Sequence, residues 1–437
     1  MKALRADLLD FVSNPAWGDV KSAAVRWRPD HWLLIDEHGR IAAVQREEPP
    51  PDVAREDHSG RLLLPGFIDT HVHSPQLAVI ASYGTALLDW LENYTFPAER
   101  AWADPDVAAR GSALFLDALL AHGTTAAVVF PTVHKVSAEA LFGAAMQRGM
   151  RIIGGKVLMD RHAPPGLIDD PERVAQAEGE CTDLIGRWHG RGRCSYAVTV
   201  RFAPTSSPAQ LAMAGGLCRA DPTLYMQTHV AENRDEVRWV AELFPQARSY
   251  LDVYAGAGLL HPRSVLAHGI WLNADDRTAL RDAGAQIAFC PSSNLFLGSG
   301  LFDWSATAAA GVQVSVASDV GGGTSLSMQR TLADGYKVQA SLGKGTGHDL
   351  SAWYALHAAT RGAAQALHLG HEIGLLEPGL MADLCLWDWA IGAVDGRRQQ
   401  VARDLHEKVF AWMLLADERH LVRTWVAGRP LFERDPA

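Results

Sequence analysis

The sequence predicts an α/β protein, with a (β/α)8 TIM barrel over residues 65–370 and a small β-sandwich domain built from residues 1–64 and 371–437. Three observations favour this fold. Strand-like apolar runs alternate with helix-like stretches through the middle of the chain, both ends hold short β-like runs, and polar residues follow the ends of the central strands. A doubly wound open sheet is the competing architecture, but the strand-end pattern favours a barrel, whose active site lies at that face.

The terminal β domain is predicted from strand-like runs on both sides of the barrel. A polar turn at 36–40, with Gly39 free to adopt a positive φ, joins two of these runs into a hairpin. The Pro-rich, charged stretch 47–56 is interpreted as a linker. The expected strands are Ser22–Trp27, His31–Ile35, Ile41–Gln45, Met381–Trp387 and Val422–Val426.

The barrel is predicted from eight strand-like runs separated by helix-like stretches. Helix signals support the alternation: one helix should begin after Asp104 and stop at Gly123, and another should begin after Asn273 and stop at Gly284. The last helix is expected from Ser351 to Gly370. The expected strands are 66–73, 124–131, 151–159, 196–204, 224–232, 264–271, 286–293 and 313–320.

The overall composition excludes several classes of protein. The chain has 437 residues and a formal charge of −10. This negative charge argues against a nucleic-acid partner, because nucleic-acid binding usually needs a basic surface. We expect no secretory signal, and no stretch approaches the roughly 20 apolar residues that span a bilayer. The five scattered cysteines form neither a zinc motif nor a disulfide framework. We therefore expect a cytoplasmic protein that acts on a small molecule, without nucleic acid or membrane.

A candidate metal site comes from polar residues at the strand ends. His71 and His73 close the first strand, and their i, i+2 spacing points both rings to one side. The pair alone is equally compatible with hydrogen-bonded histidines in a half-buried strand. His229 ends the fifth strand, His268 the sixth, and Asp319 follows the eighth, although Asp319 could serve only as a helix cap. Their equivalent barrel positions favour a shared metal.

The donor types indicate which ion the site would hold. Three imidazoles from His71, His73 and His229 with the Asp319 carboxylate suit Zn²⁺ best, and Fe²⁺ is the alternative. We expect a single ion, because a two-ion site would need a bridging lysine where the fourth strand has Arg201. A water on this ion would become a nucleophile near neutral pH. His268 is placed to orient or deprotonate that water.

These motifs resemble the amidohydrolase superfamily, and within it the guanine deaminase family. The superfamily features are PGFIDTHVH at 65–73, His229, His268 and Ser318-Asp319. The family features are Ser74-Pro75-Gln76, the segments 88–91 and 94–99, and the segments 155–160, 229–236 and 290–294. The resemblance covers nearly the whole chain.

The resemblance implies hydrolytic deamination of guanine to xanthine and ammonia, in purine catabolism, by one divalent metal ion in a homodimer. It implies that Glu232, which protonates the ring, His268 and Asp319 are catalytic. The implied substrate contacts are His73, Ser74, Pro75, Gln76, Arg201, Phe202, His229, Glu232 and Asp319.

Several of these assignments have plainer alternatives. Gln76 could cap a loop, Arg201 could pair with a local carboxylate, and Phe202 could be ordinary core. The metal residues would equally serve deamination of a pterin, an oxidised guanine or a triazine, and a non-catalytic scaffold of the same fold is a further alternative. The loop 161–170 receives no role.

Overall fold

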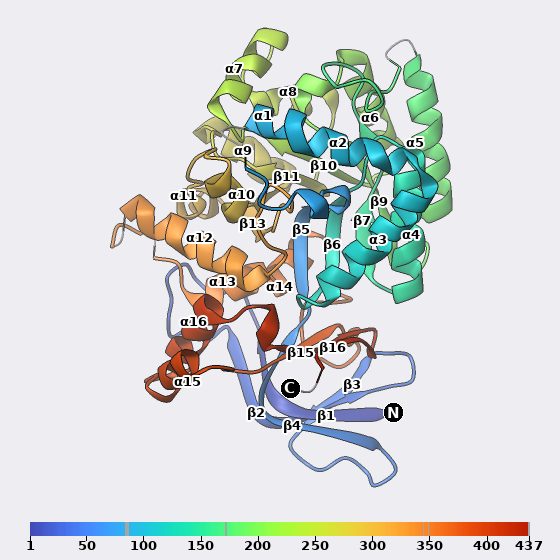
Figure 1. Cartoon of the computed structure of the whole chain (residues 1–437). Coiled ribbons are helices and arrows are strands. Elements are labelled where there is room, and N and C mark those ends of the chain that lie inside the picture. Colours follow the sequence, from blue (N-terminus) through green and yellow to red (C-terminus); the bar gives the residue numbers. More distant parts are fainter. Residues whose placement is uncertain (84–86, 171–172, 344, 348, 436–437) are drawn as a thin grey trace.

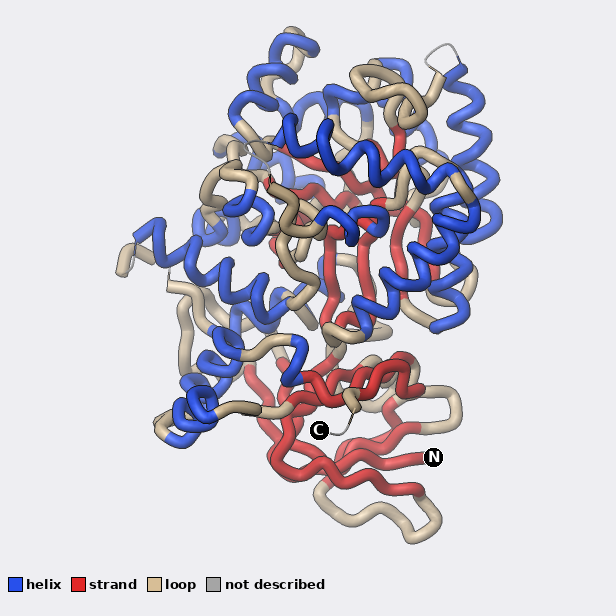
Figure 2. Tube along the Cα trace, viewed as in Figure 1, coloured by secondary structure: helices blue, strands red, loops and turns tan. Residues whose placement is uncertain are grey.

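The computed structural model describes residues 1–83, 87–170, 173–343, 345–347 and 349–435. A parallel barrel surrounded by helices lies above a second sheet made from both ends of the chain (Figures 1 and 2). No helix of the described residues is both long enough and apolar enough to cross a membrane.

The barrel strands follow one another around the sheet in chain order, and each pairs in parallel with its neighbours. The barrel closes through backbone hydrogen bonds from Asp319 N to His71 O and from His73 N to Val320 O, both 2.9 Å. Each expected strand run overlaps a strand of this sheet, so the predicted barrel is confirmed. The strands are β5 (Phe67–His73), β6 (Thr124–Phe130), β7 (Arg151–Gly154), β8 (Val157–Leu158), β9 (Cys194–Val200), β10 (Tyr225–Val230), β11 (Ser264–His268), β12 (Gln286–Phe289) and β13 (Gln313–Val316).

The third expected strand is divided into β7 and β8, which both pair with β9. Between them the chain runs so close to β9 that a side chain on Gly155 would lie 2.0 Å from the Ala197 carbonyl oxygen. Glycine therefore permits the close approach, and the next residue, Lys156, turns its side chain out of the barrel towards Asp169.

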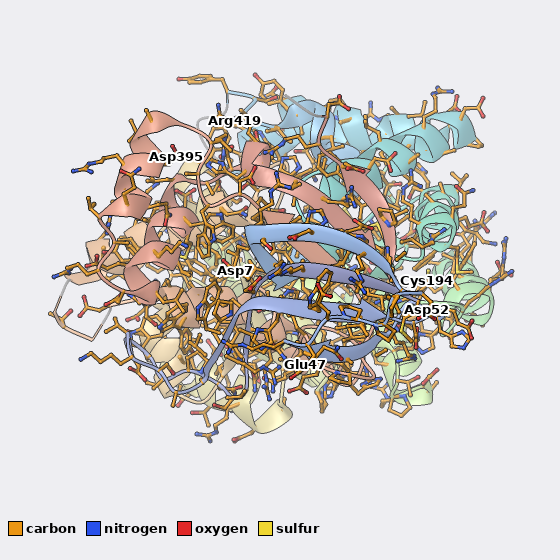
Figure 3. All side chains as sticks on the ribbon, turned by 90° about the horizontal axis from the view of Figure 1, so that it is seen from below. Asp7, Glu47, Asp52, Cys194, Asp395 and Arg419 are labelled. Atoms are coloured by element: carbon orange, nitrogen blue, oxygen red, sulfur yellow. The ribbon has the colours of Figure 1, made fainter. Side chains whose placement is uncertain are left out.

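The second sheet confirms the predicted terminal β domain. It is one mixed sheet in the order β16-β15-β14-β4-β1-β2-β3, in which β1 and β4 are parallel and the other pairs antiparallel. Seen from below, its strands cross this end of the molecule, with Asp7 near the centre of the view (Figure 3). The strands are β1 (Lys2–Phe11), β2 (Val25–Ile35), β3 (Ile41–Gln45), β4 (Ala54–Pro65), β14 (Leu384–Trp387), β15 (Leu421–Val426) and β16 (Arg429–Glu433).

Two expectations for this domain need correction. The separate runs Ser22–Trp27 and His31–Ile35 are one strand, β2, because Asp30 takes a positive φ of 54° at an irregularity and the strand continues beyond it. The linker expected at 47–56 ends early, since β4 begins at Ala54 and pairs with β1. The charged residues of β4 lie on its exposed half, so its sequence resembles a linker.

Most of the helices cover the outside of the barrel, and the last two lie beside the terminal sheet (Figure 1). Asp104 and Asn273 cap α3 and α9 as predicted, and Gly284 ends α9 with a φ of 67°. The helices are α1 (Leu87–Trp90), α2 (Phe96–Arg100), α3 (Pro105–Leu120), α4 (Lys135–Arg148), α5 (Val174–Trp188), α6 (Pro208–Ala220), α7 (Arg234–Leu243), α8 (Tyr250–Ala257), α9 (Ala274–Ala283), α10 (Pro291–Phe296), α11 (Trp304–Ala309), α12 (Met328–Gly343), α13 (Ala352–Ala358), α14 (Arg361–Ala366), α15 (Ala393–Gln400) and α16 (Leu405–Leu415).

The last barrel helix begins after Ser351 as predicted, but it is not continuous to Gly370. It breaks between α13 and α14, where the Ala359 carbonyl accepts a 3.0 Å hydrogen bond from the Ile68 N–H of β5. The Ala359 carbonyl group therefore bonds to the first strand of the barrel instead of to an N–H group farther along the helix.

Ion pairs link the barrel to the terminal domain. Arg151 and Arg193, which lie at the starts of β7 and β9, both bind Glu372, and Arg193 Nη2 also lies 2.7 Å from Asp383 Oδ2. Burial opposes ionisation of Glu372, but the two arginines outweigh it and lower the pKa of its carboxyl group. Glu372 is therefore held as a carboxylate at the end of the barrel opposite the candidate site.

Candidate metal centre and active site

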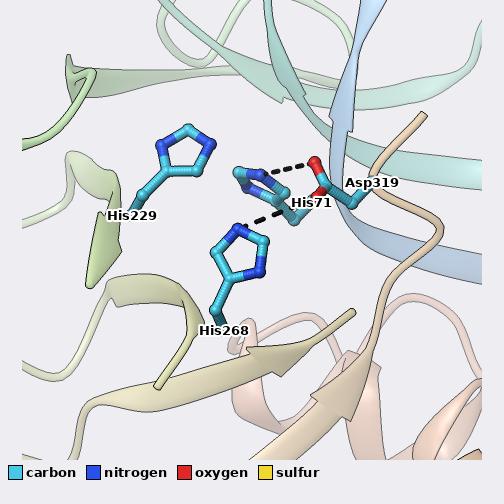
Figure 4. Close-up of side chains that lie close together, drawn as sticks. All are labelled: His71, His229, His268 and Asp319. Carbon is cyan, nitrogen blue, oxygen red and sulfur yellow. Dashed lines mark ion pairs between the residues drawn. The ribbon is translucent and has the colours of Figure 1, made fainter. Parts of the chain in front are cut away.

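The candidate site lies at the carboxyl ends of four barrel strands. His71 and His73 end β5, His229 lies in β10, His268 is the last residue of β11, and Asp319 follows β13. Figure 4 shows His71, His229, His268 and Asp319 converging from these strands, and their donor atoms all lie within 4.8 Å of one another. The structure therefore brings together the residues expected to surround a metal.

Four donor atoms lie close enough together to bind one metal ion. The Nε2 atoms of His71 and His73 are 3.2 Å apart, and the Nε2 atom of His229 is 3.3 Å from that of His73. Asp319 Oδ1 lies 3.2 Å from His71 Nε2 and 3.3 Å from His73 Nε2. Ligands bound tetrahedrally at about 2.0–2.1 Å would be separated by about 3.3 Å. The arrangement therefore fits one ion.

The protonation of the histidines suits cation binding. Burial lowers the pKa of His73 to about 3 and also lowers the pKa of His71 and of His229, so these rings are neutral near pH 7. His229 donates from Nδ1 to the Arg201 carbonyl oxygen at 2.6 Å, which leaves Nε2 unprotonated and directed at the other donors. Two unprotonated nitrogens facing one another at this distance repel unless a cation lies between them.

His268 lies beside the four donors and is oriented by Asn294, whose Oδ1 lies 2.8 Å from His268 Nδ1. Its Nε2 atom, which is buried and has no hydrogen-bond partner among the described residues, lies 3.4 Å from Glu232 and 3.7 Å from Asp319. Burial opposes protonation of His268, but the two carboxylates outweigh burial and raise its pKa. His268 can therefore accept and hold a proton at Nε2.

Glu232 lies just past the end of β10 and faces the same space. Burial raises its pKa to about 7, so the carboxyl group can carry a proton near neutrality. Ser299 Oγ donates to Glu232 Oε1 at 2.9 Å, and the backbone N–H of Glu232 donates to Glu236 Oε2 at 3.0 Å. Both the side chain and the main chain of Glu232 are thus fixed, as a proton donor requires.

A cavity opens over these groups. Its walls combine the expected polar residues with apolar side chains from α1, the η2 turn (Leu91–Thr95) and the chain after α10, which sequence reasoning did not identify. Ser74 and Pro75 are buried at the start of the η1 turn (Ser74–Val79) and do not line it. The lining residues are His73, Gln76, Trp90, Leu91, Arg201, Phe202, His229, Glu232, Glu236, His268, Leu297, Asp319 and Gly322.

Gln76 and Arg201 line the cavity and share one buried partner, Glu99. Gln76 Nε2 donates to Glu99 Oε1 at 2.8 Å, and Arg201 Nη1 lies 2.7 Å from Glu99 Oε2. The local ion pair considered as an alternative for Arg201 is therefore present, but Arg201 still reaches the cavity. Phe202 lines it as well, with its ring edge-on to Trp239 at a centroid distance of 6.2 Å.

Several residues that hold the site together were not assigned roles from the sequence. Asn294 lies in the family-like segment 290–294, which signalled its importance but not its contact with His268. Ser299 carries no such signal, since only the fold brings it to Glu232. Asp169, in the loop 161–170, binds Lys156 at 2.5 Å, so this ion pair ties the loop to the chain between β7 and β8.

The chain is similar to known proteins along nearly its whole length. The model of the amidohydrolase family matches residues 62–431. A guanine deaminase of Escherichia coli (strain K12) is 40% identical over 443 residues, covering 100% of this chain and 98% of that protein. The crystal structure of guanine deaminase from Bradyrhizobium japonicum has a TM-score of 0.94 at 34% identity, with 99% of both chains covered. A guanine deaminase from C. acetobutylicum with guanine bound in its active site has a TM-score of 0.88 at 25% identity, covering 99% of this chain and 100% of that one.

Proposed function

This chain belongs to the amidohydrolase family, and we propose that it is a guanine deaminase, which converts guanine and water to xanthine and ammonia. One observation carries the proposal: three of the proposed metal donors, His73, His229 and Asp319, line the same cavity as Glu232, Gln76 and Arg201. Full-length similarity to guanine deaminases supports the same reaction.

We propose that His71, His73, His229 and Asp319 hold one divalent ion, with Zn²⁺ as the first candidate and Fe²⁺ as the second. Three neutral imidazoles and a carboxylate form a donor set of intermediate softness, which suits these ions better than Mg²⁺ or Ca²⁺. When bound, the ion supplies Lewis-acid activation of a water molecule.

The residues around the donors would handle the protons. Water adds to the ring carbon that carries the amino group, and the bond between this carbon and the amino nitrogen later breaks. Glu232 gives a proton to the adjacent ring nitrogen as the carbon–oxygen bond forms, which prevents a full negative charge on the ring. His268 Nε2 and Asp319 take the proton of the attacking water, since they lie 3.7 Å apart at the donor set. The amino nitrogen then takes up the proton held by His268 and Asp319 and leaves as ammonia, while the added hydroxyl group returns a proton to Glu232 and becomes the new carbonyl oxygen of xanthine.

Other side chains would hold the base in place. The Arg201 guanidinium can donate to the six-position carbonyl of guanine, and Gln76 can bond the neighbouring edge of the ring. Phe202 can pack against the purine face. Trp90, Leu91 and Leu297 line the same cavity and would exclude bulk water from it, which strengthens the charge interactions. Ser74 and Pro75 would contribute indirectly by fixing the start of the turn that carries Gln76.

The remaining proposals concern the cellular setting. We propose that the enzyme acts in purine catabolism in the cytoplasm as a homodimer, independently of membranes and nucleic acids. Its five cysteines are free and buried, which suits a reducing compartment. Light scattering of the purified protein would give the oligomeric state.

Ammonia release with guanine, measured across a panel of purines, pterins and triazines, tests the reaction. Guanine is expected to have the highest kcat/KM, and one equivalent of metal should copurify with each chain. Turnover of a pterin without turnover of guanine would overturn the proposed substrate. A folded protein with neither bound metal nor activity would indicate a non-catalytic scaffold.

A further inference from the structure

Glu99 is a buried acid behind the cavity wall. It has no role in the proposed chemistry and is not among the predicted site residues. It lies in α2, its side chain is fully buried, and it does not line the cavity. Its carboxylate nevertheless contacts both residues proposed to recognise the base. Burying a carboxylate is costly unless it is paired and hydrogen-bonded, so these contacts account for its location.

The first consequence concerns Arg201. Its Nη1 atom lies 2.9 Å from Glu99 Oε1 and 2.7 Å from Glu99 Oε2, so both carboxylate oxygens bind one nitrogen. Among the described residues, Glu99 is the only hydrogen-bond partner of this guanidinium, which leaves Nε and Nη2 for a ligand. The Phe96 ring lies beside the same group, with its centroid 5.5 Å from Cζ. Glu99 and Phe96 together fix the plane of the guanidinium.

The second consequence concerns Gln76, whose amide is fixed at both ends. Nε2 donates to Glu99 Oε1 at 2.8 Å, while Oε1 accepts from the Gly321 N–H at 3.0 Å. A carboxylate can only accept and a backbone N–H can only donate, so the amide cannot exchange its oxygen and nitrogen. The wall made by Arg201 and Gln76 therefore offers hydrogen-bond donors in a fixed arrangement.

We propose that Glu99 is a specificity-determining positioning residue, which fixes Arg201 and Gln76 so that their N–H groups recognise the carbonyl oxygen at the six position of the base. This inference rests on the proposed function. A glutamine at position 99 would hold Arg201 less firmly and could itself donate to Gln76 Oε1. The Gln76 amide could then rotate, and the wall would offer an acceptor as well as donors.

A purely structural role, in which Glu99 only neutralises the buried charge of Arg201, predicts a different pattern. Loss of neutralisation would weaken folding or binding for every ligand alike. Loss of positioning should instead weaken the ligands that carry a six-position carbonyl. A site that hydrogen-bonds one group of a ligand strongly rejects ligands that lack this group. Comparing ligands with and without the six-position carbonyl therefore separates the two roles.

The experiment compares Glu99→Gln and Glu99→Asp with the unmutated protein. Ammonia release gives kcat/KM for guanine, and calorimetry gives the dissociation constants of xanthine, which has the six-position carbonyl, and of 2-aminopurine, which lacks it. Glu92→Gln is the matched control, because Glu92 is an exposed acid in the preceding turn. Thermal melting and metal content are measured for each variant.

For Glu99→Gln we expect kcat/KM for guanine and the affinity for xanthine to fall by about 10- to 100-fold, the usual effect of losing a charged hydrogen-bond partner. The 2-aminopurine affinity should change by less than about 3-fold. Glu99→Asp, which keeps the charge, should recover part of the preference, and Glu92→Gln should resemble the unmutated protein.

Equal losses for xanthine and 2-aminopurine, or no loss for either, would overturn the inference. If Glu99→Gln fails to fold, Glu99→Asp decides, because its shorter side chain should still shift the preference between the two ligands, whereas a purely neutralising carboxylate would preserve it. If the unmutated protein does not deaminate guanine, the proposed function fails, and the inference fails with it.

Discussion

The substitution Glu232→Gln tests the proposed proton transfer most directly. Glutamine has nearly the shape of glutamic acid, so it can keep the 2.9 Å contact with Ser299 Oγ through its carbonyl oxygen. It cannot, however, release a proton to the ring. Glu232 is not one of the four donors proposed to hold the metal, so the substitution separates loss of the proton donor from loss of the ion.

The size of the effect follows from the burial of Glu232. Its side chain is only 4% exposed, so water cannot easily replace it as the acid. A positioned general acid contributes about 10²- to 10⁴-fold to a rate, and we expect kcat to fall by that factor. This corresponds to about 3–5 kcal/mol of transition-state stabilisation. KM for guanine should change far less, because base recognition is assigned to Gln76 and Arg201.

The pH profile supplies a second measurement. Burial raises the pKa of Glu232 to about 7, and a cation among the four donors would favour the ionised carboxylate and lower this pKa. Since the protonated form is the acid, kcat/KM should fall as pH rises above a value at or below about 7. In Glu232→Gln this alkaline limb should be absent.

The assay is steady-state ammonia release with guanine, together with metal analysis of each preparation. Glu242→Gln, an exposed acid in α7, is the control and should match the unmutated protein. A Glu232→Gln enzyme with full metal content and a kcat within about 3-fold of the unmutated protein would refute the assignment of Glu232 as the acid.

Three further predictions follow from other parts of the structure. His71→Ala should lose most of its bound metal and more than about 10³-fold in guanine turnover, measured by elemental analysis and ammonia release; full metal content would exclude His71 as a ligand. Asn294→Ala should keep its metal but lose about 10- to 100-fold in kcat, because the hydrogen bond that orients His268 is removed; an unchanged rate would contradict this. Glu372→Gln should lower the free energy of unfolding in urea by about 1–3 kcal/mol at pH 7. Because the folded pKa of Glu372 is depressed, its contribution is present above the unfolded value and is lost as pH falls through the folded value, so variant and unmutated protein should converge in acid.

The barrel and the cluster of polar side chains at its strand ends could be predicted from the sequence because local patterns encode them. Most barrel strands are short, mainly apolar runs, and β5, β6 and β9 are fully buried along their length. A polar residue at the end of such a run is conspicuous. His71, His229, His268 and Asp319 were found in this way, and the structure brings their donor atoms together.

The contacts that complete the site could not be predicted, because they join residues that no local pattern connects. Glu99 and Arg201 are 102 positions apart, and Ser299 and Glu232 are 67 apart. The break between α13 and α14 has the same origin, since it depends on a backbone bond to β5. The start of β4 was predicted to be a linker, because the residues of its exposed half include several charges and show no alternation of apolar and polar residues.

Arg201 contacts a proposed metal ligand through its main chain, and it is proposed to recognise the base through its side chain. Its carbonyl oxygen accepts from His229 Nδ1 at 2.6 Å, and its guanidinium is held by Glu99 at 2.7 Å. The main chain therefore orients a proposed metal ligand while the side chain faces the cavity. Since Arg201 directly follows β9, the barrel sets the distance between the proposed metal ligands and the group proposed to recognise the base. Changing the Arg201 side chain should alter recognition of the base while leaving His229 in place.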